Sequence, residues 1–164
     1  MEQYDAIVIG GGVIGTSIAC HLARLGAKRT LLLERGQLGG GTTAQSSCIL
    51  RTHYSVRENV ALAQAAMRAF DDFPAYLGDD EADCGYRRCG YLIVAPEGAA
   101  ADAVRATLAI ERELGIEARE LDPSEARERH PLLRYDDVAV VGWEPGAGYA
   151  DAYMTLSASV RAAR

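Results

Sequence analysis

Short apolar runs and one helical pattern follow each other along the start of the chain. Residues 4–9 read YDAIVI, and this β-branched run predicts a strand that is buried on both faces. The next apolar residues recur at helical spacings of three and four: Ile14, Ile18, Leu22 and Leu25. Gly26 is expected to end that helix, and a second apolar strand is predicted over residues 30–33. This order predicts two parallel strands joined by one helical crossover.

The rest of the chain alternates longer helical patterns with two strands. Helices are predicted over residues 58–77 and 99–114, and strand-like runs cover residues 86–95 and 138–144. Another helix is expected to begin after Asp122, with Pro123 in its first turn, and to stop before Pro131. A last helix is predicted from about residue 150 to the final residue.

Composition and charge narrow the class of protein. Of the 164 residues, 49% are hydrophobic and 24% charged, which is ordinary for a globular domain, and the net charge is −6. The basic residues form no dense run, so a nucleic-acid partner is not expected. The first apolar run is too short for a signal peptide or a membrane span, and the four cysteines form no C-x-x-C pair. We therefore expect no membrane span, reduced thiols and a cytoplasmic location.

A glycine-rich turn joins the first predicted strand to the first helix. Residues 10–15 read GGGVIG and satisfy the G-x-G-x-x-G pattern. Gly10 permits a tight turn, Gly12 lets the backbone approach a diphosphate, and Gly15 lets the helix pack closely on the sheet. The positive end of the helix dipole then faces the phosphates. The pattern stands in the correct order of strand, helix and strand, and it predicts a dinucleotide site.

An acidic residue closes the second predicted strand. Glu34 lies where a carboxylate can accept hydrogen bonds from a ribose. The neighbouring Arg35 would favour a 2′-phosphate, but the carboxylate beside it would repel one, so NADP is disfavoured. The turn and the acid together do not separate NAD from FAD.

The following segment carries a family resemblance. Residues 35–54 read RGQLGGGTTAQSSCILRTHY, and together with the glycine-rich opening they resemble the D-amino-acid oxidase superfamily of flavoproteins. The sarcosine oxidase, glycine oxidase and dimethylglycine dehydrogenase branches are the most similar. The likeness continues in residues 89–97, 121–133 and 143–164, so it covers essentially the whole chain.

The resemblance implies a fold and a division of the chain. The expected fold class is α/β, with a Rossmann-type FAD-binding domain of the GR2-like flavoproteins and part of an inserted α+β substrate-binding domain. Residues 1–80 are expected to form the FAD-binding part, residues 81–146 the partial substrate-binding domain, and residues 147–164 a helix that returns to the FAD domain. The chain is therefore expected to be the N-terminal portion of a longer protein, whose missing half or another subunit completes it.

The resemblance also implies cofactor-binding residues. Positions that match the ADP-binding motif are Gly10, Gly12, Val13, Ile14, Gly15 and Glu34, and positions in the segment that approaches the pyrophosphate and flavin are Arg35, Thr42, Thr43 and Ser46. Relatives with a covalently held flavin often carry a histidine where this chain has Ala44 and Gln45. We therefore expect non-covalent FAD.

Two further residues are candidates for the substrate side. Arg51 matches an arginine that can pair with a substrate carboxylate in sarcosine-oxidase-like members, a task that suits the two-pronged guanidinium. A salt bridge at the surface or between domains is the alternative for Arg51. His53 lies beside it and is a weaker candidate. No spacing typical of metal ligands occurs.

The resemblance implies an FAD-dependent enzyme that oxidises the C–N bond of an amino acid or N-methyl amine, similar to sarcosine or glycine, by hydride transfer to flavin. Two alternatives stay open at this point. One is an NAD-dependent dehydrogenase with the same opening motif, although the Gly-Thr-Thr segment disfavours it. The other is a truncated or degenerate ADP-binding module without activity alone.

Overall fold

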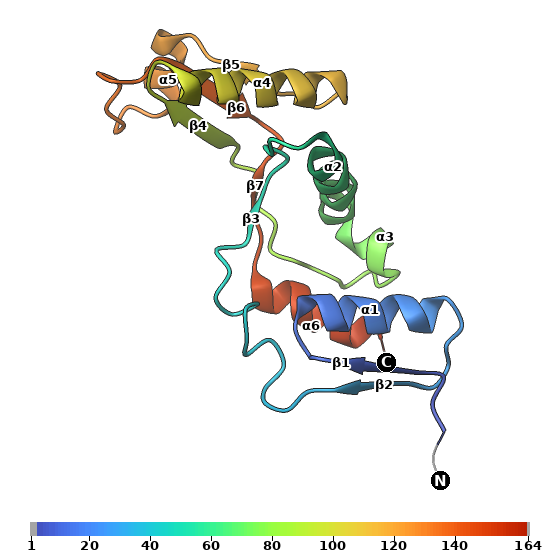
Figure 1. Ribbon diagram of the computed structural model, residues 1–164. Helices are drawn as coiled ribbons and strands as arrows, with labels where there is room; N and C mark the ends of the chain where they lie inside the picture. The colour runs from blue at the N-terminus through green and yellow to red at the C-terminus, as the bar shows by residue number, and fades with distance from the viewer. Residues whose placement is uncertain (1–2, 164) are drawn as a thin grey trace. The chain divides into compact units, whose positions relative to one another are not determined.

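The computed structural model describes residues 3–163 and shows a mixed α/β chain (Figure 1). Its internal contacts divide the described residues into two compact units. The first unit contains residues 3–49, 69–87 and 149–163, and the second contains residues 50–68 and 88–148. No helix among the described residues is both long and apolar enough to cross a bilayer.

The first unit begins with the predicted strand–helix–strand order. Strands β1 (Ala6–Ile9) and β2 (Thr30–Leu33) are parallel and in register from the pair Ala6 and Thr30 to the pair Ile9 and Leu33. Helix α1 (Val13–Arg24) connects them (Figure 1). Gly26 follows the helix with a φ of 98°, a left-handed conformation that glycine adopts without strain. The structure confirms this crossover, although β1 begins two residues later than expected.

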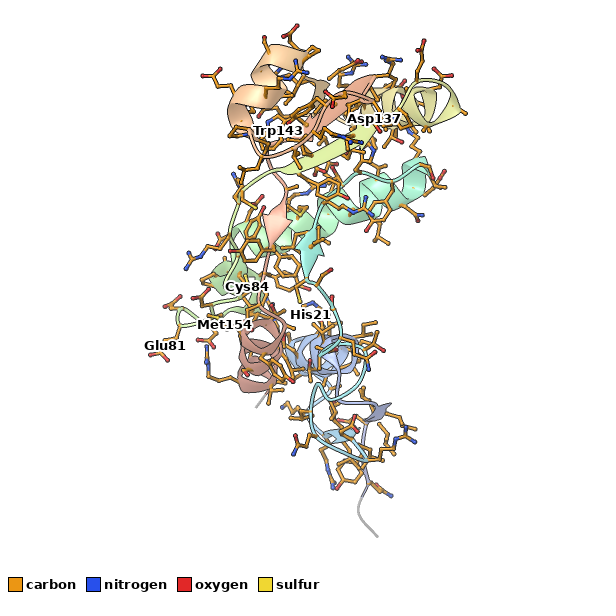
Figure 2. All side chains as sticks on the ribbon, turned by 90° about the vertical axis from the view of Figure 1, so that its left-hand side faces the viewer. His21, Glu81, Cys84, Asp137, Trp143 and Met154 are labelled. Atoms are coloured by element: carbon orange, nitrogen blue, oxygen red, sulfur yellow. The ribbon has the colours of Figure 1, made fainter. Side chains whose placement is uncertain are left out.

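Helices α3 (Phe73–Leu77) and α6 (Ala152–Ala162) complete the first unit. The Asp151 side chain caps α6 by accepting a hydrogen bond from the Met154 N–H, and α6 packs against α1. The buried core of this unit consists of Cys20, Phe73, Leu77, Ala82, Cys84 and Ala158. His21, labelled in Figure 2, lies on α1 with its Nε2 2.6 Å from the Tyr76 hydroxyl, which is a packing role. Helix α6 ends at Ala162, before the final residue at which the return helix is expected to end, and residue 164 itself lies outside the described residues.

The prediction of a single helix over residues 58–77 is wrong. The structure has two helices there, α2 (Arg57–Asp71) and α3, with a break at Asp72. Asp72 leaves the helical conformation and its side chain accepts a hydrogen bond from the Ala75 N–H, which starts a new helix. Pro74 has no N–H to donate and therefore fits the first turn of α3.

The second unit is built on an antiparallel sheet of strands β4 (Tyr91–Ala95), β6 (Val140–Glu144) and β5 (Arg119–Glu120), in the order β4–β6–β5. Helix α4 (Ala99–Glu113) packs on this sheet, with Val104 and Leu108 in a core shared with Ala95 and Val140. Helix α5 (Pro123–Arg129) begins at the Asp122 cap, as expected from the sequence. Its residue Ala126 belongs to a second apolar cluster of this unit.

The strand predicted over residues 86–95 begins only at Tyr91. Gly90 has a φ of 79°, and a Cβ at that position would lie 1.8 Å from the ring of Trp143, which Figure 2 labels. The chain therefore turns at Gly90 before it enters β4. The sequence pattern also missed β3 (Ile49–Leu50), β7 (Gly148–Tyr149) and β5, which are too short to show a period of two. Strands β3 and β7 pair with each other.

The two units do not coincide with the domains expected from the sequence. The contacts group residues 50–68 with the sheet of the second unit, whereas the sequence places them in an FAD-binding part that extends to residue 80. This segment contains Arg51 and His53. The assignment of cofactor binding to one part and substrate binding to the other stays a prediction.

Candidate functional site

The glycine turn between β1 and α1 is shaped by a left-handed backbone conformation at Gly10 and by close packing at Gly15. Gly10 has a φ of 107°, and its N–H donates to the carbonyl of Leu33 at 2.8 Å, which ties the turn to β2. A Cβ on Gly15 would lie 1.9 Å from the carbonyl oxygen of Gly10. A Cβ on Gly12 would lie 3.0 Å from the hydroxyl of Thr43. Packing therefore requires glycine at position 15 and the positive φ favours it at position 10, whereas a side chain at position 12 would require the Thr43 hydroxyl to shift.

This turn lines a cleft of about 520 Å³ within the first unit. The predicted cofactor-binding residues that line it are Gly10, Gly12, Val13, Ile14, Gly15, Glu34, Thr42, Thr43 and Ser46. Arg35 is not among the lining residues. Gly11 and residues 39–41 also line the cleft, although the sequence analysis gave them no role. The second run of three glycines, before Thr42, was the available sequence signal for them.

Glu34 links the glycine turn to the segment after β2, with one carboxylate oxygen for each. Its Oε2 accepts a hydrogen bond from the Gly11 N–H at 2.7 Å, and its Oε1 accepts one from the Gly36 N–H at 2.7 Å. The hydrogen bond from Gly11 is the largest cause that lowers the pKa of Glu34 below its ordinary value. A carboxylate oxygen has a further lone pair after one such bond. The ionised side chain can therefore hold the turn and accept hydrogen bonds from a sugar hydroxyl.

Thr43 takes the place of a cap on α1. The residue before the helix is Gly12, which has no side chain to accept a hydrogen bond from the first turn. The hydroxyl oxygen of Thr43 instead accepts the hydrogen bond of the Val13 N–H at 3.1 Å. The first turn of α1 and the positive end of its dipole thus lie at a cleft wall, where they favour an anionic group.

Replacing Thr43 by valine is expected to weaken FAD binding about 3- to 10-fold, the effect of losing one neutral hydrogen bond. Valine keeps the branched shape but offers no acceptor to the Val13 N–H. Isothermal titration with FAD measures the change. Thr107→Val is the matched control, because that hydroxyl bonds only its own helix in the second unit. Equal affinities of Thr43→Val and the control would contradict the role of the hydroxyl.

Arg51 and His53 lie together in the second unit. The Arg51 guanidinium lies over the rings of Tyr54 and Tyr91, at 4.9 and 5.2 Å from their centroids. Its Nη1 donates to the carbonyl of His53 at 2.5 Å. A guanidinium carries five N–H donors, and this recorded bond uses one of them. The contacts recorded for the described residues hold Arg51 by stacking rather than by an ion pair.

Two buried acids beside this segment were missed by the sequence analysis. Glu111 on α4 is 0% exposed and Glu144 at the end of β6 is 2% exposed, and both carboxyl groups contact Thr52. The available signal was the position of Glu111, which follows Val104 and Leu108 at helical spacing on the apolar side of α4.

Comparison with known proteins shows the family of the chain. The family model described as FAD dependent oxidoreductase, of the DAO family, matches residues 5–164. The chain belongs to this family. The match confirms the resemblance seen in the sequence, the Rossmann-type fold class and the prediction of FAD as the cofactor.

Several relatives of this FAD-dependent oxidoreductase family align with nearly all of the chain. Mitochondrial sarcosine dehydrogenase of Mus musculus is 29% identical over 97% of the chain and 17% of its own length. Sarcosine oxidase subunit beta of an Arthrobacter species is 28% identical over 91% of the chain and 38% of its own length. The crystal structure of glycine oxidase from Geobacillus kaustophilus superimposes with a TM-score of 0.84 and 26% identity, over 99% of the chain and 45% of that protein. The chain thus spans 17%, 38% and 45% of the length of these three relatives.

The cleft of the first unit fits the ADP part of the family's cofactor. Gly12 and Gly15 present no side chain to the cleft, α1 directs the positive end of its dipole to it, and the ionised Glu34 is one of its lining residues. These groups would bind the diphosphate and the ribose. Thr42, Thr43 and Ser46 also line the cleft, and their direct contact with FAD stays a prediction.

Proposed function

We propose that this protein oxidises the C–N bond of an amino acid or N-methyl amine with FAD as the cofactor. The observation that carries the proposal is the cleft at the start of α1, where the Glu34 carboxylate accepts a hydrogen bond from the glycine turn. The names of its relatives support the substrate class, since they include sarcosine dehydrogenase, sarcosine oxidase subunit beta and glycine oxidase. FAD, when bound, supplies the acceptor for the hydride that leaves the substrate carbon.

The residues of this chain would provide binding and electrostatics for that reaction. The glycine turn and Glu34 would hold the adenosine diphosphate end of FAD. Arg51 would bind the carboxylate of the substrate, because its guanidinium lies over two rings and the one hydrogen bond seen for it among the described residues leaves N–H donors for a carboxylate. His53 would lie on the substrate side beside it. Non-covalent FAD and a cytoplasmic location remain predictions.

Replacing Arg51 by lysine is expected to raise the KM for a carboxylate substrate about 10- to 100-fold, with a smaller change in kcat. Lysine keeps the charge but offers no planar pair of donors and cannot stack on both rings in the same way. Steady-state assays with sarcosine, glycine and proline on the FAD-loaded protein measure the effect. The matched control is Arg57→Lys, since Arg57 is exposed and pairs with Glu113.

Two results of this assay would count against the proposal. A protein that binds FAD but oxidises none of the three substrates would overturn the proposed substrate class. An Arg51→Lys variant with the same KM as Arg57→Lys would overturn the assigned role of Arg51 and leave the substrate class in place.

A further inference from the structure

Three polar side chains from distant parts of the sequence meet inside the second unit. Thr52 follows β3, Glu111 belongs to α4 and Glu144 ends β6, and each of the three is at most 3% exposed. The Thr52 N–H donates to Glu144 Oε1 at 2.8 Å, and its hydroxyl oxygen lies 2.6 Å from the same atom. The hydroxyl oxygen of Thr52 also lies 3.2 Å from Glu111 Oε1. One hydroxyl therefore bridges two buried carboxyl groups.

The number of available protons limits how these contacts can be made. A threonine hydroxyl has one hydrogen, whereas an ionised carboxylate can only accept. Both contacts of the Thr52 hydroxyl can be separate two-centre hydrogen bonds only if one carboxyl group brings a proton of its own. Glu144 Oε2 is buried and has no hydrogen-bond partner among the described residues. A negative charge shared by that oxygen would be poorly compensated.

The groups around the pair favour Glu144 as the carboxyl group that holds the shared proton for most of the time. Glu111 Oε2 lies 3.2 Å from His53 Nδ1, so Glu111 has a counter-ion when the histidine is protonated. The groups that face Glu144 are Glu111, which belongs to α4, and Tyr91, which is its pairing partner on β4. The ring of Tyr91 lies beneath the Arg51 guanidinium. Burial is the largest cause that raises the pKa of Glu144, and the negative charge of Glu111 raises it further, whereas the bonds from Thr52 and the charge of His53 lower it.

We propose that Glu111 and Glu144 share one proton across Thr52 at neutral pH, and that this acid pair positions the segment from Arg51 to His53. Thr52 lies between the two residues assigned to the substrate side. The acid pair holds both the backbone N–H and the hydroxyl of Thr52. The charge state of the pair therefore affects the backbone position of the residues on either side of Thr52. The consequence for substrate binding rests on the proposed function, whereas the shared proton does not.

Infrared spectroscopy of the full chain labelled with ¹³C-glutamate tests the shared proton directly. We expect the carbonyl band of a protonated carboxylic acid at pH 7, its loss in Glu144→Gln, and its retention in Glu113→Gln. Glu113 is the matched control, because it lies on the same helix as Glu111 but its side chain is 64% exposed and pairs with Arg57. Absence of the band from the wild-type protein at pH 7 would overturn the proposal, whether or not the variants fold.

Stability measurements test the same proton independently. A folded state that keeps a proton released by the unfolded chain loses stability as the pH rises above the ordinary carboxyl pKa of 4.5 and through the raised value. We expect the Tm of the wild-type protein to fall relative to that of Glu144→Gln over this range, with Glu113→Gln following the wild type. Parallel pH profiles of wild type and Glu144→Gln would contradict a proton on Glu144.

The positioning role has its own measurement in the FAD-loaded protein. As Glu144 loses its proton, the KM for sarcosine is expected to rise severalfold with little change in kcat, and this rise is expected to be absent from Glu144→Gln. A KM with the same pH profile in both proteins would overturn the positioning role. Lack of all turnover would instead count against the proposed function, and the infrared and stability results would still decide the shared proton.

Discussion

Replacing Gly15 by alanine is expected to lower the affinity for FAD by about 100-fold or more, the upper range of effects for a forced steric overlap. The added Cβ would lie 1.9 Å from the carbonyl oxygen and 3.0 Å from the carbonyl carbon of Gly10. Both of those atoms belong to the backbone, so no flexible side chain can move aside. The first turn of α1 must instead move away from the glycine turn, and the wall that faces the diphosphate loses its shape.

The matched control for this experiment is Gly36→Ala. Its Cβ would lie 3.6 Å from Glu34 Oε1, an ordinary van der Waals contact, and the Gly36 N–H that bonds Glu34 is retained. Fluorescence titration with FAD measures the affinity, and circular dichroism shows whether the fold persists. A folded Gly15→Ala protein that binds FAD as tightly as Gly36→Ala would contradict the assigned role of the turn.

Replacing Glu34 by alanine is expected to lower the affinity for FAD on the order of 10- to 100-fold. The substitution removes the acceptor for the N–H groups of Gly11 and Gly36 and the charge available to a ribose. Glu34→Gln is expected to bind weakly as well, because one of those two N–H groups would then face an amide NH₂. The matched control is Glu81→Ala, an exposed acid of the first unit that Figure 2 labels.

The pH dependence of FAD affinity shows whether the ionised form of Glu34 contributes to FAD binding. The pKa of Glu34 is lowered in the folded protein, so its ionised form contributes fully above the ordinary value of 4.5. The contribution is lost as the pH falls through the lowered value. The affinities of the wild-type protein and Glu34→Ala are therefore expected to differ at neutral pH and to converge in acid. An affinity ratio that is the same at both pH values would contradict an ionic role.

Much of the candidate cofactor site, the cleft lined by the glycine turn, could be predicted because its signals are local. The apolar run of β1, the helical spacing in α1 and the apolar run of β2 each lie within one element, and the glycines stand between them. Glu34 was found because it follows the end of β2 directly. Elements and turns of this kind depend on neighbouring residues, so a single sequence shows them.

The contacts that complete the site could not be predicted, because they join residues far apart in the chain. The hydroxyl of Thr43 caps a helix that begins thirty positions earlier, and Gly11 bonds the carboxylate of Glu34. Sequence spacing suggested a sugar-binding role for the acid but did not show that it also braces the turn. The break at Asp72 was missed because a cap inside an otherwise helical pattern changes the periodicity very little.

The acid pair of the second unit illustrates the same limit for buried polar groups. Glu111 shares the apolar side of α4 but is a charged residue type, and Glu144 stands at the end of an apolar strand, so the sequence names no partner for either. Only the tertiary fold brings their carboxyl groups to the hydroxyl of Thr52. A buried carboxyl group needs hydrogen-bond partners, and here the three groups that meet come from three separate segments of the chain.

Competition between ADP and FAD shows whether the cleft of the first unit binds the adenosine diphosphate end of the cofactor. We expect that ADP displaces FAD at one site, that Thr43→Val weakens both ligands by the same factor, and that Arg51→Lys weakens neither. Binding of FAD that ADP does not affect, or no affinity for either ligand in a folded protein, would contradict it.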